Sequence, residues 1–186
     1  MRLARKHRKE VWKGAVAGMA GGLAASWVMN QFQTAWSKAA EVIKSNGRQG
    51  SQQPSGDSED DATMKMANKL AAPVLRRELT KGEKRTAGPI VHYTFGALAG
   101  GVYGAAVEVV PGLRTGFGLP YGTAVFVGAD EMAVPALGLS KPAAKYPVST
   151  HVNALASHLV YGATLELVRR GVRRLLGSAP NLEGGE

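Results

Sequence analysis

Charged residues gather in three blocks along the chain, and long stretches without charge separate them. The blocks are residues 1–13, 38–85 and 169–186. Residues 14–37 hold no charged residue, and residues 86–107 hold only His92. Both stretches approach the roughly 20 residues with which an α-helix spans a hydrocarbon core of about 30 Å. This segregation predicts helices that cross a membrane.

The stretch from Gly116 to Arg170 adds two further apolar runs joined by a short Lys/Pro linker. The first run carries Asp130 and Glu131, and the second carries His151 and His158. The pattern therefore predicts an all-α integral membrane protein, a bundle of about four transmembrane helices. The predicted spans are 14–36, 88–110, 116–139 and 147–168.

Glycines recur every four residues in the first two spans. They form two overlapping Gly-x-x-x-Gly steps in each: Gly14, Gly18 and Gly22, then Gly96, Gly100 and Gly104. Such stripes let helix backbones approach closely in lipid, where hydrophobicity does not drive helices together. The two stripes pack on each other within the chain, or one of them forms a homodimer face.

The charge blocks also divide the chain into segments. We predict a basic cytoplasmic head (1–13), a first membrane helix (14–37), a polar link (38–88), a membrane helical core (89–174) and a flexible tail (175–186). The apolar run after the head favours an anchor at anionic lipid over nucleic-acid binding. That run is longer than the roughly 7–15 residues of a signal-peptide core, which argues against cleavage.

The polar link has two parts. The first is rich in Gly, Ser and Gln with an acidic end, as is typical of a mobile loop. The second places Met66, Leu70, Val74 and Leu75 at helical spacing among Lys and Arg. This pattern predicts an amphipathic segment on the membrane surface, interrupted at Pro73.

Ionisable side chains inside a membrane mark function or a partner by default, because charge is costly there. Both termini are predicted to be cytoplasmic, because the basic head beside the first span usually sets orientation. At about 1.5 Å per residue, Asp130, Glu131 and His158 then lie about 12–17 Å below the outer side. They form a predicted intramembrane polar cluster. His92 and His151 lie about 6 Å deep, as outer-rim polar residues.

Two further features bear on this cluster. Pro135 lacks an N–H, so the carbonyl of Glu131 four residues earlier loses its helical donor at a predicted helix break. Glu108 and Glu166 reach the inner rim, where Arg114, Arg169 and Arg170 lie within reach in sequence.

The sequence carries no enzyme signature, with no nucleophile elbow, phosphate-binding loop or zinc-protease motif. It has no cysteine, so thiol chemistry is excluded. A metal site from His92, His151, His158 and Glu131 lacks any compact ligand spacing. We therefore predict no enzymatic activity, no cofactor, no bound metal and no nucleic-acid partner.

The run GADEMAVPALGLSKPAAKYPVSTHVNALASHLVYGATLELVRR, with HYTFGALAGGVYG before it, resembles the YagU-like bacterial inner-membrane proteins. The resemblance covers roughly residues 89–174. It implies a multi-pass protein of the bacterial plasma membrane with a loose link to acid tolerance, and it supplies no catalytic residues.

Three functions fit these features. The first is a small accessory or homo-oligomeric structural membrane protein that uses the polar cluster to fix its helices. The second is a proton or cation pathway with Asp130 and Glu131 as acceptors and His158 as relay. The third is a subunit that docks on a larger membrane complex through its glycine faces.

Overall fold

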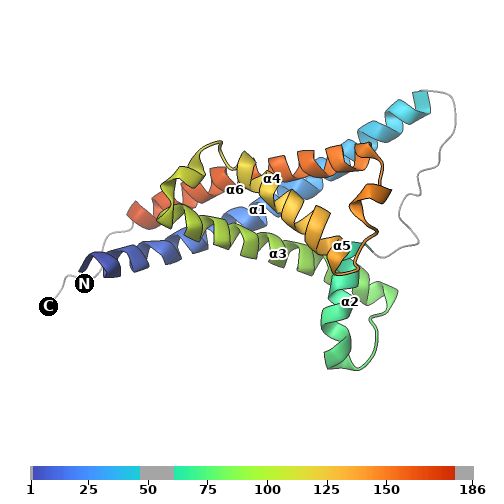
Figure 1. Cartoon of the computed structure of the whole chain (residues 1–186), viewed down its shortest axis with the longest axis horizontal. Coiled ribbons are helices and arrows are strands. Elements are labelled where there is room, and N and C mark those ends of the chain that lie inside the picture. The colour runs from blue at the N-terminus through green and yellow to red at the C-terminus, as the bar shows by residue number, and fades with distance from the viewer. Residues whose placement is uncertain (1, 47–60, 179–186) are drawn as a thin grey trace.

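Helices make up all the regular structure that the computed structural model describes, which is residues 2–46 and 61–178 (Figure 1). The predicted all-α class is therefore confirmed. The acidic part of the link and most of the predicted tail, residues 47–60 and 179–186, lie outside the described residues.

Three long helices form the body of the molecule, and shorter elements complete it. The long helices are α1 (Arg2–Asn46), α3 (Lys81–Val109) and α6 (Val148–Ser178). The shorter helices are α2 (Ala62–Leu75), α4 (Leu119–Val125), the π-helix η2 (Phe126–Ala133), α5 (Val134–Ala136) and the 3-10 turns η1 (Pro111–Arg114) and η3 (Ala143–Lys145).

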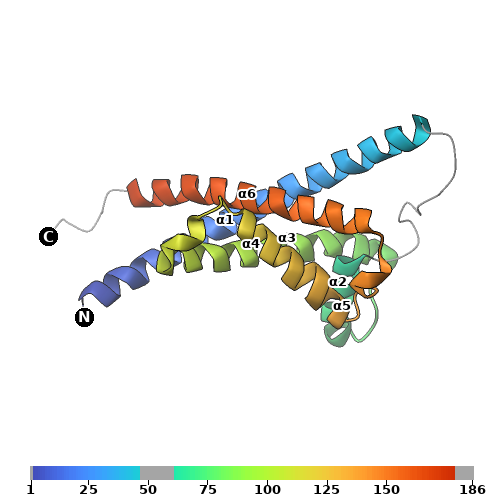
Figure 2. The same cartoon turned by 45° about the horizontal axis from the view of Figure 1, so that its top comes forward.

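The long helices lie side by side, with α1 in contact with both α3 and α6 (Figure 1). Helix α4 packs on α6, η2 makes a smaller contact with α6, and α2 packs on α3 (Figure 2). Lys13 Nζ donates a hydrogen bond to the Leu176 carbonyl at 3.3 Å. The beginning of α1 and the end of α6 therefore lie at the same end of the bundle.

The two predicted glycine stripes meet each other along the α1–α3 contact. Gly18 faces Gly100 so closely that a Cβ on either residue would overlap the backbone carbonyl of the other. The same holds for the contact of Gly14 with Gly104, while a Cβ on Gly22 would overlap the Gly96 carbonyl. Of the two alternatives, the structure shows packing within the chain.

A second close approach joins α4 to α6. A Cβ on Gly118 would overlap the Gly162 carbonyl, and a Cβ on Gly122 would overlap that of His158. Gly118 has φ of +80°, a conformation that glycine adopts at little cost, and it caps the N-terminus of α4. Gly118 and Gly122 are also four residues apart in the sequence, but this single step was not among the predicted packing faces.

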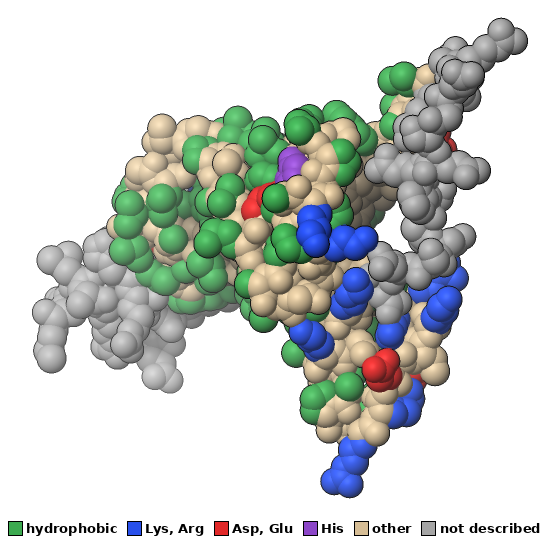
Figure 3. Space-filling model, turned by 45° about the vertical axis from the view of Figure 1, so that its right-hand side comes forward, with side chains coloured by type: hydrophobic (Ala, Val, Ile, Leu, Met, Phe, Trp, Pro, Cys, Tyr) green, Lys and Arg blue, Asp and Glu red, His purple; other side chains and the backbone are tan. Residues whose placement is uncertain are grey.

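Small and polar side chains make up part of the interior, and many large apolar side chains face outward. Ala17, Ala25, Ser26 and Ser157 are almost fully buried. The exposed apolar residues follow helical spacing: Trp12, Val16, Met19, Leu23 and Trp27 on α1, and Phe95, Leu98, Val102 and Val109 on α3. Hydrophobic side chains accordingly cover much of the flank in Figure 3. This arrangement matches helices packed in lipid better than a water-soluble core.

Among the described residues, α3 alone is long and apolar enough to cross a membrane, judged by length and composition. The other predicted spans fall short for visible reasons. Helices α1 and α6 carry Gly, Ser, Thr and other polar residues among their apolar ones, which lower their mean hydropathy. The third predicted span is divided among α4, η2 and α5. Four membrane crossings therefore stay a prediction.

The long helices continue past the predicted span limits. One helix, α1, runs through both the basic head and the predicted first span and ends nine residues into the predicted link, at Asn46. Near the other end of the link, α3 already begins at Lys81. The predicted interruption of the amphipathic segment at Pro73 is wrong, because α2 continues through Pro73 and ends at Leu75.

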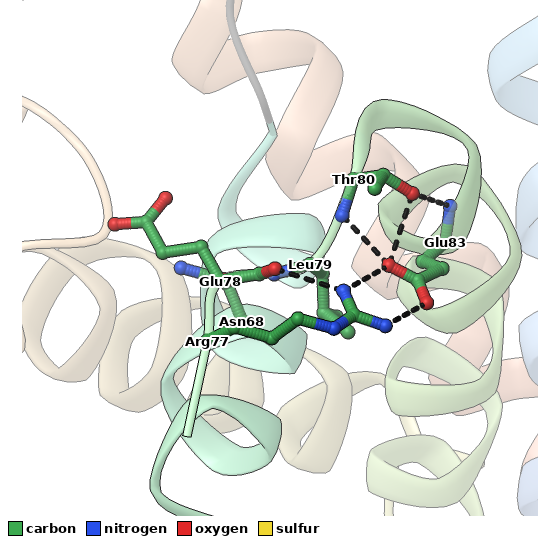
Figure 4. Close-up of polar contacts among 6 residues, drawn as sticks. All are labelled: Asn68, Arg77, Glu78, Leu79, Thr80 and Glu83. Atoms are coloured by element: carbon green, nitrogen blue, oxygen red, sulfur yellow. Dashed lines mark hydrogen bonds and ion pairs between the residues drawn. The ribbon is translucent and has the colours of Figure 1, made fainter. Parts of the chain in front are cut away.

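A compact set of polar contacts joins α2 to α3 (Figure 4). Helix α2 ends at Leu75, and its C-cap residue Arg76 adopts the left-handed conformation with φ of 53°. Helix α3 then starts with a capping box, in which Thr80 and Glu83 satisfy each other's backbone N–H groups. Arg77 also binds Glu83 through both carboxylate oxygens, at 2.7 and 2.8 Å. The turn is therefore fixed by short-range contacts that the sequence encodes locally.

These contacts predict an acid-sensitive turn. The Arg77 hydrogen bond and the Thr80 bonds lower the pKa of Glu83, in the first turn of α3, to about 2. Because the folded-state pKa is depressed, the stabilisation is complete above the ordinary pKa of 4.5 and is lost as pH falls towards 2. Carboxyl 13C NMR should show Glu83 titrating near pH 2 and Arg77→Gln moving it upward. A wild-type midpoint near 4.5 would contradict these contacts.

The α1–α3 contact predicts that added volume is not tolerated there. Gly100→Ala places a methyl group against the Gly18 carbonyl and 2.8 Å from Gly22 Cα. Overpacking of this kind costs about 1–3 kcal/mol, so the melting temperature in detergent should fall. The matched control is Gly171→Ala on α6, where no atom lies within 4 Å. That change should be neutral or stabilising by up to about 1 kcal/mol. Equal melting temperatures for the two variants would refute the tight contact.

Candidate functional site

The two adjacent acids lie on the π-helix η2, between α4 and α5. Its hydrogen-bond register is wider than that of an α-helix, since the Val134 N–H donates to the Ala129 carbonyl five residues earlier. Pro135 follows directly. The sequence predicted a helix break at this proline, and the structure shows a widened helix before it. Single π-helical turns are frequent at functional sites.

Glu131 binds His151 rather than the predicted partner His158. Glu131 Oε1 lies 2.7 Å from His151 Nδ1, and the other ring nitrogen lies 3.2 Å from the Ala143 carbonyl. Both neighbours are acceptors, so the ring can donate to both only when both nitrogens carry a proton. The geometry therefore favours a charged imidazolium paired with a carboxylate.

Asp130 lies beside His158, as predicted, but the two are not hydrogen-bonded. Asp130 Oδ2 is 3.7 Å from His158 Nδ1, while this nitrogen donates to the Ala154 carbonyl at 2.9 Å. The ring of Phe126 packs against that of His158, with centroids 5.8 Å apart. The imidazole is therefore held in place by its own helix, and the carboxylate remains available to another group.

His92 on α3 lies within electrostatic reach of His158 and Asp130. Its Nε2 atom is buried and has no hydrogen-bond partner among the described residues. The position of His92 at an outer membrane rim stays a prediction.

Tyrosine hydroxyls form the next polar layer towards the other end of α6. Tyr161 donates to the Gly96 carbonyl and Tyr121 to the Ala99 carbonyl, both at 2.7 Å. Tyr161 and Tyr103 lie in the buried core with Ala25, Met29, Val107 and Leu165. This layer was not predicted from the sequence. Tyrosines in the spans beside a glycine-rich helix were a usable signal, because glycines leave backbone carbonyls accessible to hydroxyl donors.

Buried ion pairs lie at the end of the bundle where α6 finishes. Glu166 is fully buried and binds Arg169 and Arg170 at 2.7 and 2.6 Å. Glu108 on α3 binds Arg173 of α6 at 2.8 Å, so Arg173 takes the role expected of Arg114. A buried charge without a partner is far more costly than a paired one, so these ion pairs have a structural role in closing this end of the bundle.

The polar residues therefore form two acid–imidazole pairs, and the described residues contain no group of three or more His, Cys, Asp or Glu suited to a metal ion. What the arrangement offers chemically is the holding and exchange of protons. Glu131 and His151 form a closed pair, whereas Asp130, His158 and His92 keep unused hydrogen-bonding capacity.

Comparison with known proteins places the chain in a family. The family model described as "Protein of unknown function (DUF1440)" matches residues 67–167, which is just over half of the chain. The chain belongs to this DUF1440 family. No curated protein and no solved structure matches the chain.

The DUF1440 match covers α3 to most of α6 and part of α2, and so includes both acid–imidazole pairs. Most of it overlaps the stretch on which the chain resembles YagU-like proteins. The match supports membership of an uncharacterised family and does not tie the chain to YagU in particular.

Proposed function

We propose that this DUF1440 protein is a small multi-pass protein of the bacterial inner membrane, with both termini cytoplasmic, that works as an accessory or homo-oligomeric structural protein. The Asp130 surface of the bundle then packs against another transmembrane helix, from a second copy or from a larger complex.

Several features support four crossings. The α4–η2–α5 segment, residues 119–136, is about 27 Å long at 1.5 Å per residue, close to a hydrocarbon core. Large apolar side chains face outward on every long helix, including Leu167 at 61% exposure on α6. The polar groups lie mainly between helices, where membrane proteins keep them.

One observation carries the role assigned to the cluster: the Asp130 side chain is 42% exposed on the flank of the bundle. A carboxylate facing lipid is costly. A partner helix that donates a hydrogen bond to it removes that cost, so the exposed acid favours an interface.

Cysteine cross-linking tests this proposal, since the chain has no natural cysteine. Val127 lies about one turn before Asp130 and is 45% exposed. Val127→Cys should form dimers with a short bismaleimide in native membranes, and adding Asp130→Asn should weaken them at least several-fold. Leu23→Cys on α1, 47% exposed, is the matched control.

Each cross-linking outcome has a meaning. A homodimer at Val127→Cys supports self-association, and an adduct with a different membrane protein supports docking on a larger complex. Absence of any adduct, or equal yields at both positions, would overturn the interface.

A proton or cation pathway is the second candidate, favoured by the buried His92 Nε2 without a partner beside His158 and Asp130. Polar groups continue from there through Tyr161 towards Glu166. A wild-type protein in liposomes loaded with a pH-sensitive dye should then pass protons. Asp130→Asn should abolish the flux and leave the melting temperature unchanged, with the exposed Glu78→Gln as the control. Absence of wild-type flux excludes proton transport.

A further inference from the structure

Helix α2 stands apart from the bundle. It lies across one end of the molecule, at a steep angle to the long helices, and packs on the start of α3 (Figure 1). Lys69 donates to the Leu137 carbonyl, which also ties α2 to the loop after α5. In the membrane arrangement proposed above, a helix so placed lies near the plane of the bilayer surface, as interfacial amphipathic helices do.

Apolar hollows occupy the corner between α2 and α3. Two shallow cavities of about 430 and 400 Å³ share Ala71, Ala87 and Ile90 in their walls. Large apolar side chains around them are exposed: Ile90 by 62%, Leu70 by 63% and Val74 by 82%. Nothing within the described chain covers this corner, and it continues into the outward apolar side of α3.

Cations surround the same corner. Three cationic residues are sequence neighbours of residues that line the hollows. Arg76 follows Leu75, Lys81 precedes Gly82, and Arg85 precedes Thr86. All three are exposed, and none of their side chains has a hydrogen bond or ion pair within the described residues. Arg77 differs, since Glu83 already neutralises it. Lys and Arg side chains gather over this end of the molecule in Figure 3.

We propose that this corner binds an anionic phospholipid, with acyl chain in the apolar hollows and phosphate at Arg76 and Lys81. The inference rests on the membrane location proposed above. Guanidinium and ammonium groups pair well with phosphate, and basic residues beside an interfacial helix attract anionic lipids. A corner that is apolar towards the bilayer and cationic at its edge matches the two halves of such a lipid.

An acidic peptide is the competing occupant, since it satisfies the cations equally well. The exposed aliphatic side chains of Leu70, Val74 and Ile90 favour the lipid, because they need a long apolar ligand. Their continuity with the outward apolar side of α3 also places the corner where lipid chains would already lie.

Native mass spectrometry tests the lipid site on the full chain in mild detergent, with added phosphatidylglycerol or phosphatidylcholine. The wild type should retain phosphatidylglycerol at a several-fold lower lipid concentration than it retains phosphatidylcholine. The double variant Arg76→Gln/Lys81→Gln should lose that preference. Lys38→Gln/Lys145→Gln removes equal charge from exposed positions elsewhere and should keep it. Leu70→Ser/Val74→Ser should weaken retention of both lipids.

The outcomes separate this site from the membrane location itself. Carbonate extraction of cell membranes reports the membrane location independently. If the protein stays in the pellet but shows no lipid preference, the lipid site alone is overturned. If the protein appears in the supernatant, both proposals are overturned. Equal loss of preference in the two double variants reduces the effect to overall charge and overturns the site. Displacement of phosphatidylglycerol by an oligoglutamate peptide, with no effect of Leu70→Ser/Val74→Ser, assigns the corner to an acidic peptide instead.

Discussion

Backbone contact between α1 and α3 is the constraint on which the rest of the structure depends. Gly18 and Gly100 approach so closely that neither tolerates a side chain, and the glycines on either side repeat the contact along both helices. Helices this close have no room for large side chains at the glycine contact itself, and many large apolar residues of both helices point outward. In water an apolar exterior of this kind would promote aggregation, whereas in lipid it is the favourable surface. In lipid, dispersion between the close backbones would hold the helices together.

The polar residues follow from the same packing. Close helices leave their carbonyls accessible, and Tyr121 and Tyr161 use those of α3 as acceptors. At one end of α6 the buried Glu166 is fully paired with arginines, which makes that network structural. Nearer the other end Asp130 is half-exposed and only close to His158. The molecule therefore pairs its charges at one end of α6. Towards the other end it leaves Asp130 without a hydrogen-bonded partner, where a partner helix or a proton could bind the carboxylate.

Much of the fold could be predicted because its signals are local. Charge segregation gave the long helices, and the four-residue glycine spacing gave the packing faces of α1 and α3. The proximity of Asp130 and His158 was also predicted. The pairing of Glu131 with His151 was not, because it depends on the π-helix η2, and widening of a helix has no clear sequence signal. The depth of His92 in a membrane stays a prediction, because it depends on where the bilayer lies along α3.

Spin-label accessibility in liposomes tests the outward apolar surface most directly. Single cysteines replace Leu98, Val102 and Leu167, which are 58–66% exposed around the bundle, and Ile43, which is 74% exposed on α1 beyond the predicted first span. Nitroxides at the first three positions should collide with oxygen and be shielded from a water-soluble nickel complex, while the one at Ile43 should show the reverse. Ready access of the nickel complex to Leu98, Val102 and Leu167 would contradict a bundle that lies in lipid around a glycine contact.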